Sequence, residues 1–287
     1  MDRKSIKPMK MLMRNTFTDE NVGELLGDSE TWKDFAKRQT NFFQFAKTFL
    51  NQDWNPEKHW LVEFPLIKGM PLAILCLNSA WACQDNHDKE NILLGEFQVH
   101  HALKSAEKAP LPIALFHHPF SHLKPFDAES VEGSLAASGG SHFLLRGHLH
   151  KNKLHLQQRP DSKVFEFAAG ACWESPNSTQ GAMAVKLNVK TGQGTVKTWS
   201  YFPDDGGYWT EGRYKGLKNG EWAFDIPPEW KLSKAQSKPA GFSGSLIPPT
   251  WRAHLVDSYG GMNLCFPKIL RQVHIFWVPL AIPIFRQ

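Results

Sequence analysis

Three short, strongly apolar runs constrain the fold of this chain more than any other feature. They span residues 72–77, 112–116 and 143–145. The first run is almost wholly apolar, as expected for a central strand that is covered on both faces. A helix is expected over residues 97–106, between the first two runs. We therefore predict an α/β fold, in which residues 60–64 form a further strand.

The sequence before residue 60 has a helical pattern. Between Trp32 and Leu50, apolar residues recur mostly at intervals of three and four positions, and Asp28 or Ser29 is placed to cap a helix. Residues 1–59 are therefore predicted to be a helical N-terminal segment.

The pattern changes to alternation after residue 151. It predicts a meander of antiparallel strands at residues 153–157, 164–167, 182–188 and 194–201. A polar stretch rich in Ser, Gly and Pro follows and is typical of a linker. We predict a domain over residues 60–228, a linker over 229–250, and a tail of unknown structure over 251–287.

Length and charge limit the classes of protein. A chain of 287 residues fits one large domain, or one domain with a smaller appendage. Its 33 Lys and Arg against 28 Asp and Glu give a net charge of only +5, and no basic run is present. This balance is too weak to indicate a nucleic-acid-binding protein, so nucleic acid is considered only as a substrate.

Cysteine usage and hydropathy indicate the compartment. The four cysteines are far apart in the sequence and form no CxxC pair, so we expect reduced thiols and no zinc site at Cys76, Cys83, Cys172 and Cys265. No apolar segment follows the first residues, and the apolar stretch 275–285 is about half a membrane span. We expect a cytoplasmic protein without a membrane partner.

Histidines follow two of the apolar runs directly. Nine of the 13 histidines lie between His100 and His155. His117-His118-Pro119 follows residues 112–116, and Gly147-His148-Leu149-His150 follows residues 143–145. Ligands bind at the carboxyl ends of the strands in open α/β sheets, and imidazole is a donor for Zn, Mn, Fe or Ni. The two segments together predict a metal site.

These two segments resemble the fourth and fifth signature motifs of the calcineurin-like metallophosphoesterases. Two further elements are similar to that family and occur in the same order, Leu77-Asn78-Ser79 and Gly95-Glu96-Phe97-Gln98. The resemblance covers roughly residues 60–205. It implies part of an αββα sandwich, with an antiparallel meander after the second histidine motif.

The resemblance also implies an activity and a set of site residues. His117 and His148 would be ligands of one metal, and His150 a ligand of a second. His118, the candidate catalytic residue, would lie behind the metal ligands or face the substrate. The family uses two divalent transition metals (Mn, Fe, Zn or Ni), about 3.5 to 4 Å apart, to hold a hydroxide and clamp the phosphate oxygens. The implied reaction is hydrolysis of a phosphomonoester or phosphodiester.

The sequence departs from the family in its first half. Members begin with D-x-H, G-D and G-N-H-D or G-N-H-E motifs, and none of these occurs in the expected place. Gly27-Asp28 lacks a preceding strand. Asp85-Asn86-His87-Asp88 follows the strand that ends at Asn78-Ser79, where the order of the family's motifs expects a variable loop. We expect that the chain starts downstream of the first half of the catalytic domain, so that the activity of this chain alone is open. A partner chain or a missing N-terminal segment would then complete the site.

Two other hypotheses remain. One is a non-catalytic binding or regulatory module derived from the same fold. The other is a mononuclear, histidine-rich metal site with an added ligand from His142, His155 or Asp127. The sequence disfavours a serine hydrolase and a P-loop enzyme, because it contains neither a G-x-S-x-G elbow nor a G-x-x-x-x-G-K-[ST] loop.

Overall fold

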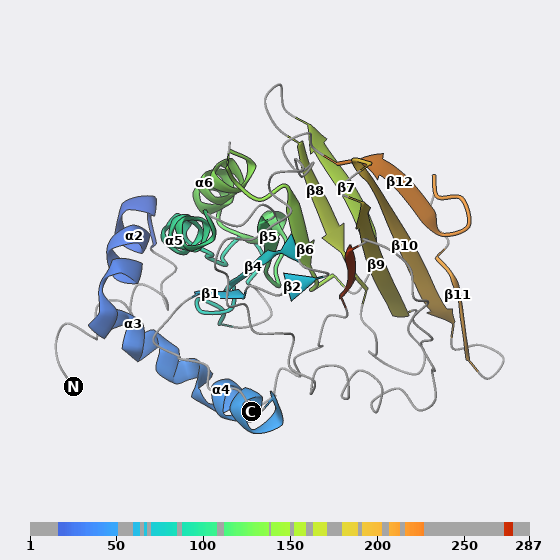
Figure 1. Ribbon diagram of the computed structural model, residues 1–287. Coiled ribbons are helices and arrows are strands. Elements are labelled where there is room, and N and C mark those ends of the chain that lie inside the picture. Colours follow the sequence, from blue (N-terminus) through green and yellow to red (C-terminus); the bar gives the residue numbers. More distant parts are fainter. Residues whose placement is uncertain are drawn as a thin grey trace.

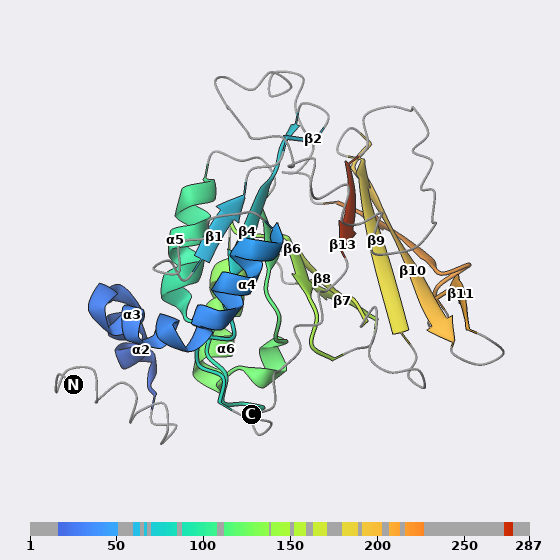
Figure 2. The same cartoon turned by 90° about the horizontal axis from the view of Figure 1, so that it is seen from below.

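The protein is a mixed α/β structure in which helices, a first sheet and a second sheet lie in successive layers (Figures 1 and 2). The architecture is taken from a computed structural model. It describes residues 17–50, 60–63, 66–67, 70–84, 88–107, 112–137, 139–149, 152–158, 163–170, 180–188, 191–202, 207–212, 216–226 and 273–277.

The first sheet has six strands in the order β1-β4-β5-β6-β8-β7. Its strands are β1 (Trp60–Glu63), β4 (Ala73–Leu77), β5 (Pro112–Leu115), β6 (Phe143–Arg146), β7 (Lys153–Gln158) and β8 (Lys163–Ala168). β4, β5, β6 and β8 run parallel, whereas β1 and β7 pair antiparallel at the two edges. The predicted α/β class and the strands at the three apolar runs are confirmed.

The second sheet is antiparallel, with the order β11-β10-β9-β13, and β12 also pairs with β10. Its strands are β9 (Gln180–Asn188), β10 (Gln193–Phe202), β11 (Tyr208–Glu211), β12 (Glu221–Asp225) and β13 (Val273–Trp277). A separate pair, β2 (Leu66–Ile67) and β3 (Met70–Pro71), forms a two-stranded ribbon.

Two helices cover the face of the first sheet that is turned away from the second sheet (Figure 2). They are α5 (Glu96–Ala106), which confirms the helix expected at 97–106, and α6 (Pro125–Ala136), which follows the short helix η2 (Phe120–His122). Val99 and Ala102 of α5 and Val131 of α6 are fully buried against strand residues that include Leu75 and Ala114. This packing makes β4 and β5 central strands with both faces covered.

A phenylalanine-rich core joins the two sheets. Phe143 and Phe165 on neighbouring strands of the first sheet stack with ring centroids 5.1 Å apart, and Phe165 contacts Phe224 of β12 at 4.6 Å. All three side chains are buried, together with Val185 of β9 and Val196 of β10. Large aromatic side chains bury much apolar area, so this core holds the sheets together.

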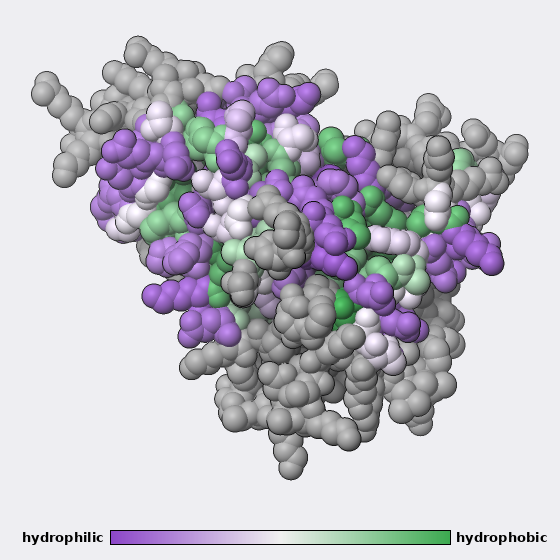
Figure 3. Space-filling view, turned by 90° about the horizontal axis from the view of Figure 1, so that it is seen from above, coloured by the Kyte–Doolittle hydropathy of each residue, from purple (hydrophilic) through white to green (hydrophobic). Residues whose placement is uncertain are grey.

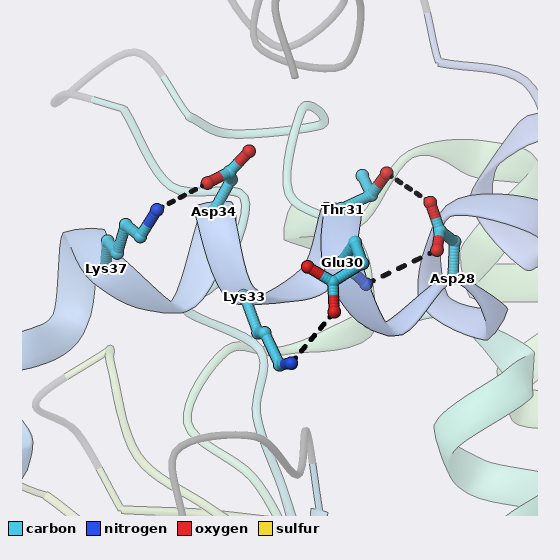
Figure 4. Close-up of polar contacts among 6 residues, drawn as sticks. All are labelled: Asp28, Glu30, Thr31, Lys33, Asp34 and Lys37. Atoms are coloured by element: carbon cyan, nitrogen blue, oxygen red, sulfur yellow. Dashed lines mark hydrogen bonds and ion pairs between the residues drawn. The ribbon is translucent and has the colours of Figure 1, made fainter. Parts of the chain in front are cut away.

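The N-terminal segment forms the helices α2 (Asp19–Gly27), α3 (Ser29–Ala36), η1 (Lys37–Gln39) and α4 (Thr40–Leu50). Asp28 caps α3 as predicted: its carboxylate accepts hydrogen bonds from the Glu30 N–H at 3.3 Å and the Thr31 hydroxyl at 2.6 Å (Figure 4). The same figure shows the ion pairs Lys33–Glu30 and Lys37–Asp34 one turn apart.

The helices α2 and α3 pack on the loop after β4. Trp32 and Phe35 of α3 make edge-to-face contacts with Trp81, at centroid distances of 6.2 and 5.5 Å. All three rings are almost completely buried. The N-terminal segment thus supports the loop that begins at Asn78.

The predicted meander is wrong in its pairing. The strands β7 and β8 form an antiparallel hairpin as expected, but β8 also pairs parallel with β6 and so belongs to the first sheet. Only β9 and β10 of the four predicted strands lie in the second sheet. An alternating pattern specifies which side chains face a core, but the same alternation fits either pairing direction.

The strand β13 lies within the tail whose structure the sequence did not indicate. It pairs antiparallel with β9 from Val273 to Trp277. The linker predicted at residues 229–250 lies outside the described residues.

None of the helices within the described ranges has the length and apolar character needed to cross a bilayer. Hydrophilic residues spread over the described part of the face in Figure 3, with smaller hydrophobic patches between them. Cys76 and Cys83 are thiols in this part of the chain, whereas Cys172 and Cys265 lie outside it.

Candidate metal centre

The two histidine segments meet at the carboxyl edge of the first sheet. Parallel pairing continues past the strand ends, since the Phe116 N–H donates to the Leu145 carbonyl at 3.1 Å. The Gly147 N–H then donates to the carbonyl of His117 at 3.2 Å. These backbone bonds fix the position of His148 relative to His117.

The ring nitrogens of His117 and His148 face each other. The distance from His117 Nε2 to His148 Nδ1 is 3.3 Å, and the two rings are nearly perpendicular. An ion bound at about 2.0–2.1 Å from each of two nitrogens in tetrahedral geometry places these nitrogens about 3.3 Å apart. The two nitrogens share a hydrogen bond in this structure, and their spacing also suits one transition-metal ion bound between them.

A third histidine adjoins this pair. One ligand nitrogen from each of His117, His118 and His148 lies within 4.8 Å of the other two. The ring of His118 is 4.7 Å from each of the other rings, measured between centroids. The structure thus brings together three of the four histidines predicted for the site, and the fourth, His150, lies outside the described residues.

His148 has a strained backbone. Its φ angle is 69°, in the left-handed region that non-glycine residues seldom adopt. Such a conformation costs on the order of 1–3 kcal/mol and is concentrated at functional sites. This backbone conformation turns the chain at His148, where the Leu149 N–H donates to the Gly147 carbonyl at 2.9 Å.

His118 is buried and held by the loop after β4. Its Nδ1 lies 2.9 Å from the hydroxyl oxygen of Ser79, and its Nε2 lies 3.9 Å from the sulfur of Cys83. Burial, and then the neighbouring His117, His148 and His122, lower the pKa of His118 from 6.5 to about 3. The His118 ring is therefore neutral at physiological pH. Burial likewise raises the pKa of the Cys83 thiol to about 12, so this thiol stays protonated.

A network of amide side chains fixes the Ser79 loop. The buried Gln98 of α5 accepts from the Asn78 N–H at 2.9 Å and donates to the Asn78 carbonyl at 3.0 Å. The two sequence elements Leu77-Asn78-Ser79 and Gly95–Gln98 are thus in direct contact.

The N-terminal helices also bond this loop. The Asn78 side chain donates to Gln39, at 2.8 Å. Arg38 donates to the carbonyls of Trp81 and Cys83 in the same loop.

A buried ion pair lies beneath the second histidine segment. The guanidinium of Arg146 pairs with Glu166 of the neighbouring strand, and it also donates to the Gly147 carbonyl at 3.4 Å. Arg146 and Glu166 are 5% and 9% exposed. Because the Gly147 carbonyl precedes His148, this pair supports the strained turn.

The three residues considered above as ligands of a mononuclear metal site have other partners in the structure. Asp127 is buried and accepts the backbone N–H groups of Leu94 and Gly95, at 2.7 and 2.9 Å. His142 bonds the Lys163 carbonyl at 3.0 Å, and His155 lies beside Glu166 at 3.3 Å. None of the three belongs to the histidine cluster found among the described residues.

Gly27-Asp28 and Asp85–Asp88 are partial matches to the first motifs of the metallophosphoesterases. Among the residues that the structure describes, neither supplies a ligand to the histidine cluster. Asp28 caps α3, as Figure 4 shows, and Asp88 accepts the Gln84 N–H at 2.8 Å. Residues 85–87, the rest of the Asp85–Asp88 motif, lie outside the described part of the chain.

The sequence analysis missed His122. Its ring lies 4.6 Å from that of His148, measured between centroids, because η2 turns the chain back after Pro119. Burial, followed by Lys89 and Arg146, lowers the pKa of His122. The signal in the sequence is its spacing of four residues from His118, which becomes meaningful only once a turn after Pro119 is known.

The low pKa of His118 predicts a pH dependence of stability. Below pH 6.5 the unfolded chain takes up a proton that the folded chain excludes until about pH 3. The free energy of unfolding should therefore fall as the pH is lowered through this window, by up to about 1.4 kcal/mol per pH unit from this group. Urea unfolding of the wild type and of His118→Gln at pH 6.5 and 5 isolates the effect. An equal loss of stability in both proteins would contradict it.

Comparison with known proteins does not identify a family for this chain. No protein-family model matches the chain, and no curated protein or solved structure matches it. The fold and the histidine cluster therefore rest on the residues themselves.

Proposed function

We propose that this chain is the metal-binding part of a metal-dependent phosphoesterase, in which His117 and His148 hold a divalent transition metal. The observation that carries the proposal is the 3.3 Å approach of His117 Nε2 to His148 Nδ1 at the carboxyl edge of a parallel sheet. Two imidazoles that converge from adjacent strand ends suit Mn, Fe, Zn or Ni.

The surrounding motifs favour phosphate-ester hydrolysis over metal storage. The described elements follow the order of the metallophosphoesterase motifs, and helices, a first sheet and a second sheet correspond to three of the four layers of an αββα sandwich. A bound divalent ion would polarise a phosphoryl oxygen. His118, which lies beside the metal ligands, would then contact the phosphate ester, and as a neutral ring it adds no positive charge next to the ion.

A dinuclear centre needs more ligands than the described cluster contains. This cluster consists of three histidines and no carboxylate. His150 and bridging carboxylates, from outside the described residues or from a partner chain, would be required for a second ion. The composition of the cluster is the specific observation that favours a second candidate, a metal-binding module that does not catalyse hydrolysis.

Hydrolysis of a chromogenic phosphodiester and a chromogenic phosphomonoester by the full chain tests the proposal. Turnover should require added Mn²⁺ or Zn²⁺ and should be lost with a chelator. His117→Ala should lose this turnover, whereas His155→Ala, an exposed histidine on β7, should retain it. Metal binding without turnover would reject the phosphoesterase and leave the non-catalytic module.

A further inference from the structure

We infer that Ser79 fixes His118 as the tautomer with its proton on Nε2, so that His118 is a hydrogen-bond donor beside the metal ligands and not a third metal ligand. The assignment rests on the proposed function only in naming a phosphate oxygen as the acceptor. It follows from the contacts that surround the Ser79 hydroxyl.

The Ser79 hydroxyl oxygen has two backbone donors beside it. The backbone N–H groups of His117 and His118 both point to it, each at 3.3 Å. A backbone N–H can only donate, and a hydroxyl oxygen has two lone pairs. These two bonds therefore use the acceptor capacity of Ser79.

The Ser79 hydroxyl has its own proton to donate to a third neighbour. With both lone pairs used, the hydroxyl can only donate to its third neighbour, His118 Nδ1, at 2.9 Å. A ring nitrogen that accepts a hydrogen bond carries no proton. In a neutral imidazole the proton is then on Nε2.

The surroundings of Nε2 agree with a donor there. The nearest sulfur, that of Cys83, lies 3.9 Å away and can accept only weakly. The Cys83 thiol itself donates to the Ser79 carbonyl at 3.6 Å. A phosphate oxygen is a much stronger acceptor than the Cys83 sulfur and would take the hydrogen bond from it. The ring also has a backbone contact with Ser79, which raises its pKa against the effect of burial.

A ligand role for His118 would need the opposite arrangement. Metal-binding histidines usually donate the second ring N–H to an acceptor, which leaves the other nitrogen for the ion. Ser79 would then have to accept three hydrogen bonds. The hydroxyl at position 79 therefore distinguishes His118 from His117 and His148.

The same protein contains a reference for the opposite tautomer. His142 Nδ1 lies 3.0 Å from the Lys163 carbonyl, which can only accept, so this ring carries its proton on Nδ1. His142 is buried as deeply as His118, at 6% exposure, and lies outside the cluster. Its spectrum should therefore be unaffected by changes at Ser79.

The test is two-bond ¹⁵N–¹H correlation spectroscopy of the full, metal-free chain, labelled with ¹⁵N-histidine, at a pH above 7. His118→Gln and His142→Gln assign the two rings. We expect the Nε2–H form at His118 and the Nδ1–H form at His142. Ser79→Ala should reduce the preference at His118 by about tenfold, the worth of one hydrogen bond. Ser79→Thr, which keeps the hydroxyl, should restore it.

Added Zn²⁺ separates this inference from the proposed function. The signals of His117 and His148 should shift, while His118 keeps its Nε2 proton. Loss of that proton on zinc binding, or an Nδ1–H form in the metal-free wild type, would overturn the inference. An unchanged tautomer ratio in Ser79→Ala, with the His142 signal intact, would overturn it too. If zinc shifts no histidine, the metal-dependent function fails while the tautomer assignment is still supported.

Discussion

Replacing His148 with alanine is expected to lower the affinity of the chain for Mn²⁺ or Zn²⁺ by more than about 100-fold. Changing a residue that only orients a metal ligand typically costs 10- to 100-fold in affinity, so removing a direct ligand should cost more. His148 supplies one of the two nitrogens that lie 3.3 Å apart, and its removal leaves His117 without the facing donor. Isothermal titration of the metal-free chain measures the change.

Two further variants make this result specific. His155→Ala removes a histidine whose side chain is 59% exposed and which lies outside the cluster, so its metal affinity should equal that of the wild type. His148→Gly removes the same ligand but suits the φ angle of 69° better than alanine does. His148→Gly should therefore bind the metal ion much more weakly, with no fall in the free energy of unfolding. Equal affinity in His148→Gly and the wild type would contradict the assignment.

The second large effect is expected at Glu166. Glu166→Ala leaves the guanidinium of Arg146 buried without its carboxylate, and breaking a buried ion pair in this way costs about 3–5 kcal/mol. The loss should appear as a lower midpoint in urea unfolding followed by tryptophan fluorescence. It should also weaken metal binding, because Arg146 donates to the Gly147 carbonyl that precedes His148.

A matched pair on the second sheet provides the control. Glu211 lies 3.3 Å from Lys197, but these side chains are 50% and 33% exposed, so Glu211→Ala should cost about 1 kcal/mol or less. The double variant Arg146→Met, Glu166→Leu should recover most of the stability lost in Glu166→Ala, since it removes the unpaired charge. A loss at Glu166 as small as that at Glu211 would show that the pair does not support the site.

The strands and the meeting of the histidines were predictable from the sequence for one physical reason. Strands buried on both faces appear as continuous apolar runs, and parallel strands bring their carboxyl ends to the same edge. The runs at 72–77, 112–116 and 143–145 therefore predicted β4, β5 and β6, and with them the proximity of His117 to His148. The cap at Asp28 was predictable for a different reason, because capping depends only on a few neighbouring residues.

Pairing between distant segments could not be derived in this way. The strands β8 and β13 pair with β6 and β9, and nothing local in their sequences specifies these partners. The same limit applies within the site. The contact of His122 with His148 and the three bonds of the Ser79 hydroxyl depend on loops that approach each other only in the folded chain.

The central claim is that an ion binds between His117 and His148. Anomalous X-ray diffraction from crystals of the full chain grown with Zn²⁺, recorded on both sides of the zinc absorption edge, tests it most directly. The account predicts an anomalous peak about 2.0–2.1 Å from His117 Nε2 and His148 Nδ1, with His118 Nδ1 still on Ser79. Zinc bound only at other residues, with these two nitrogens still facing each other directly, would contradict it.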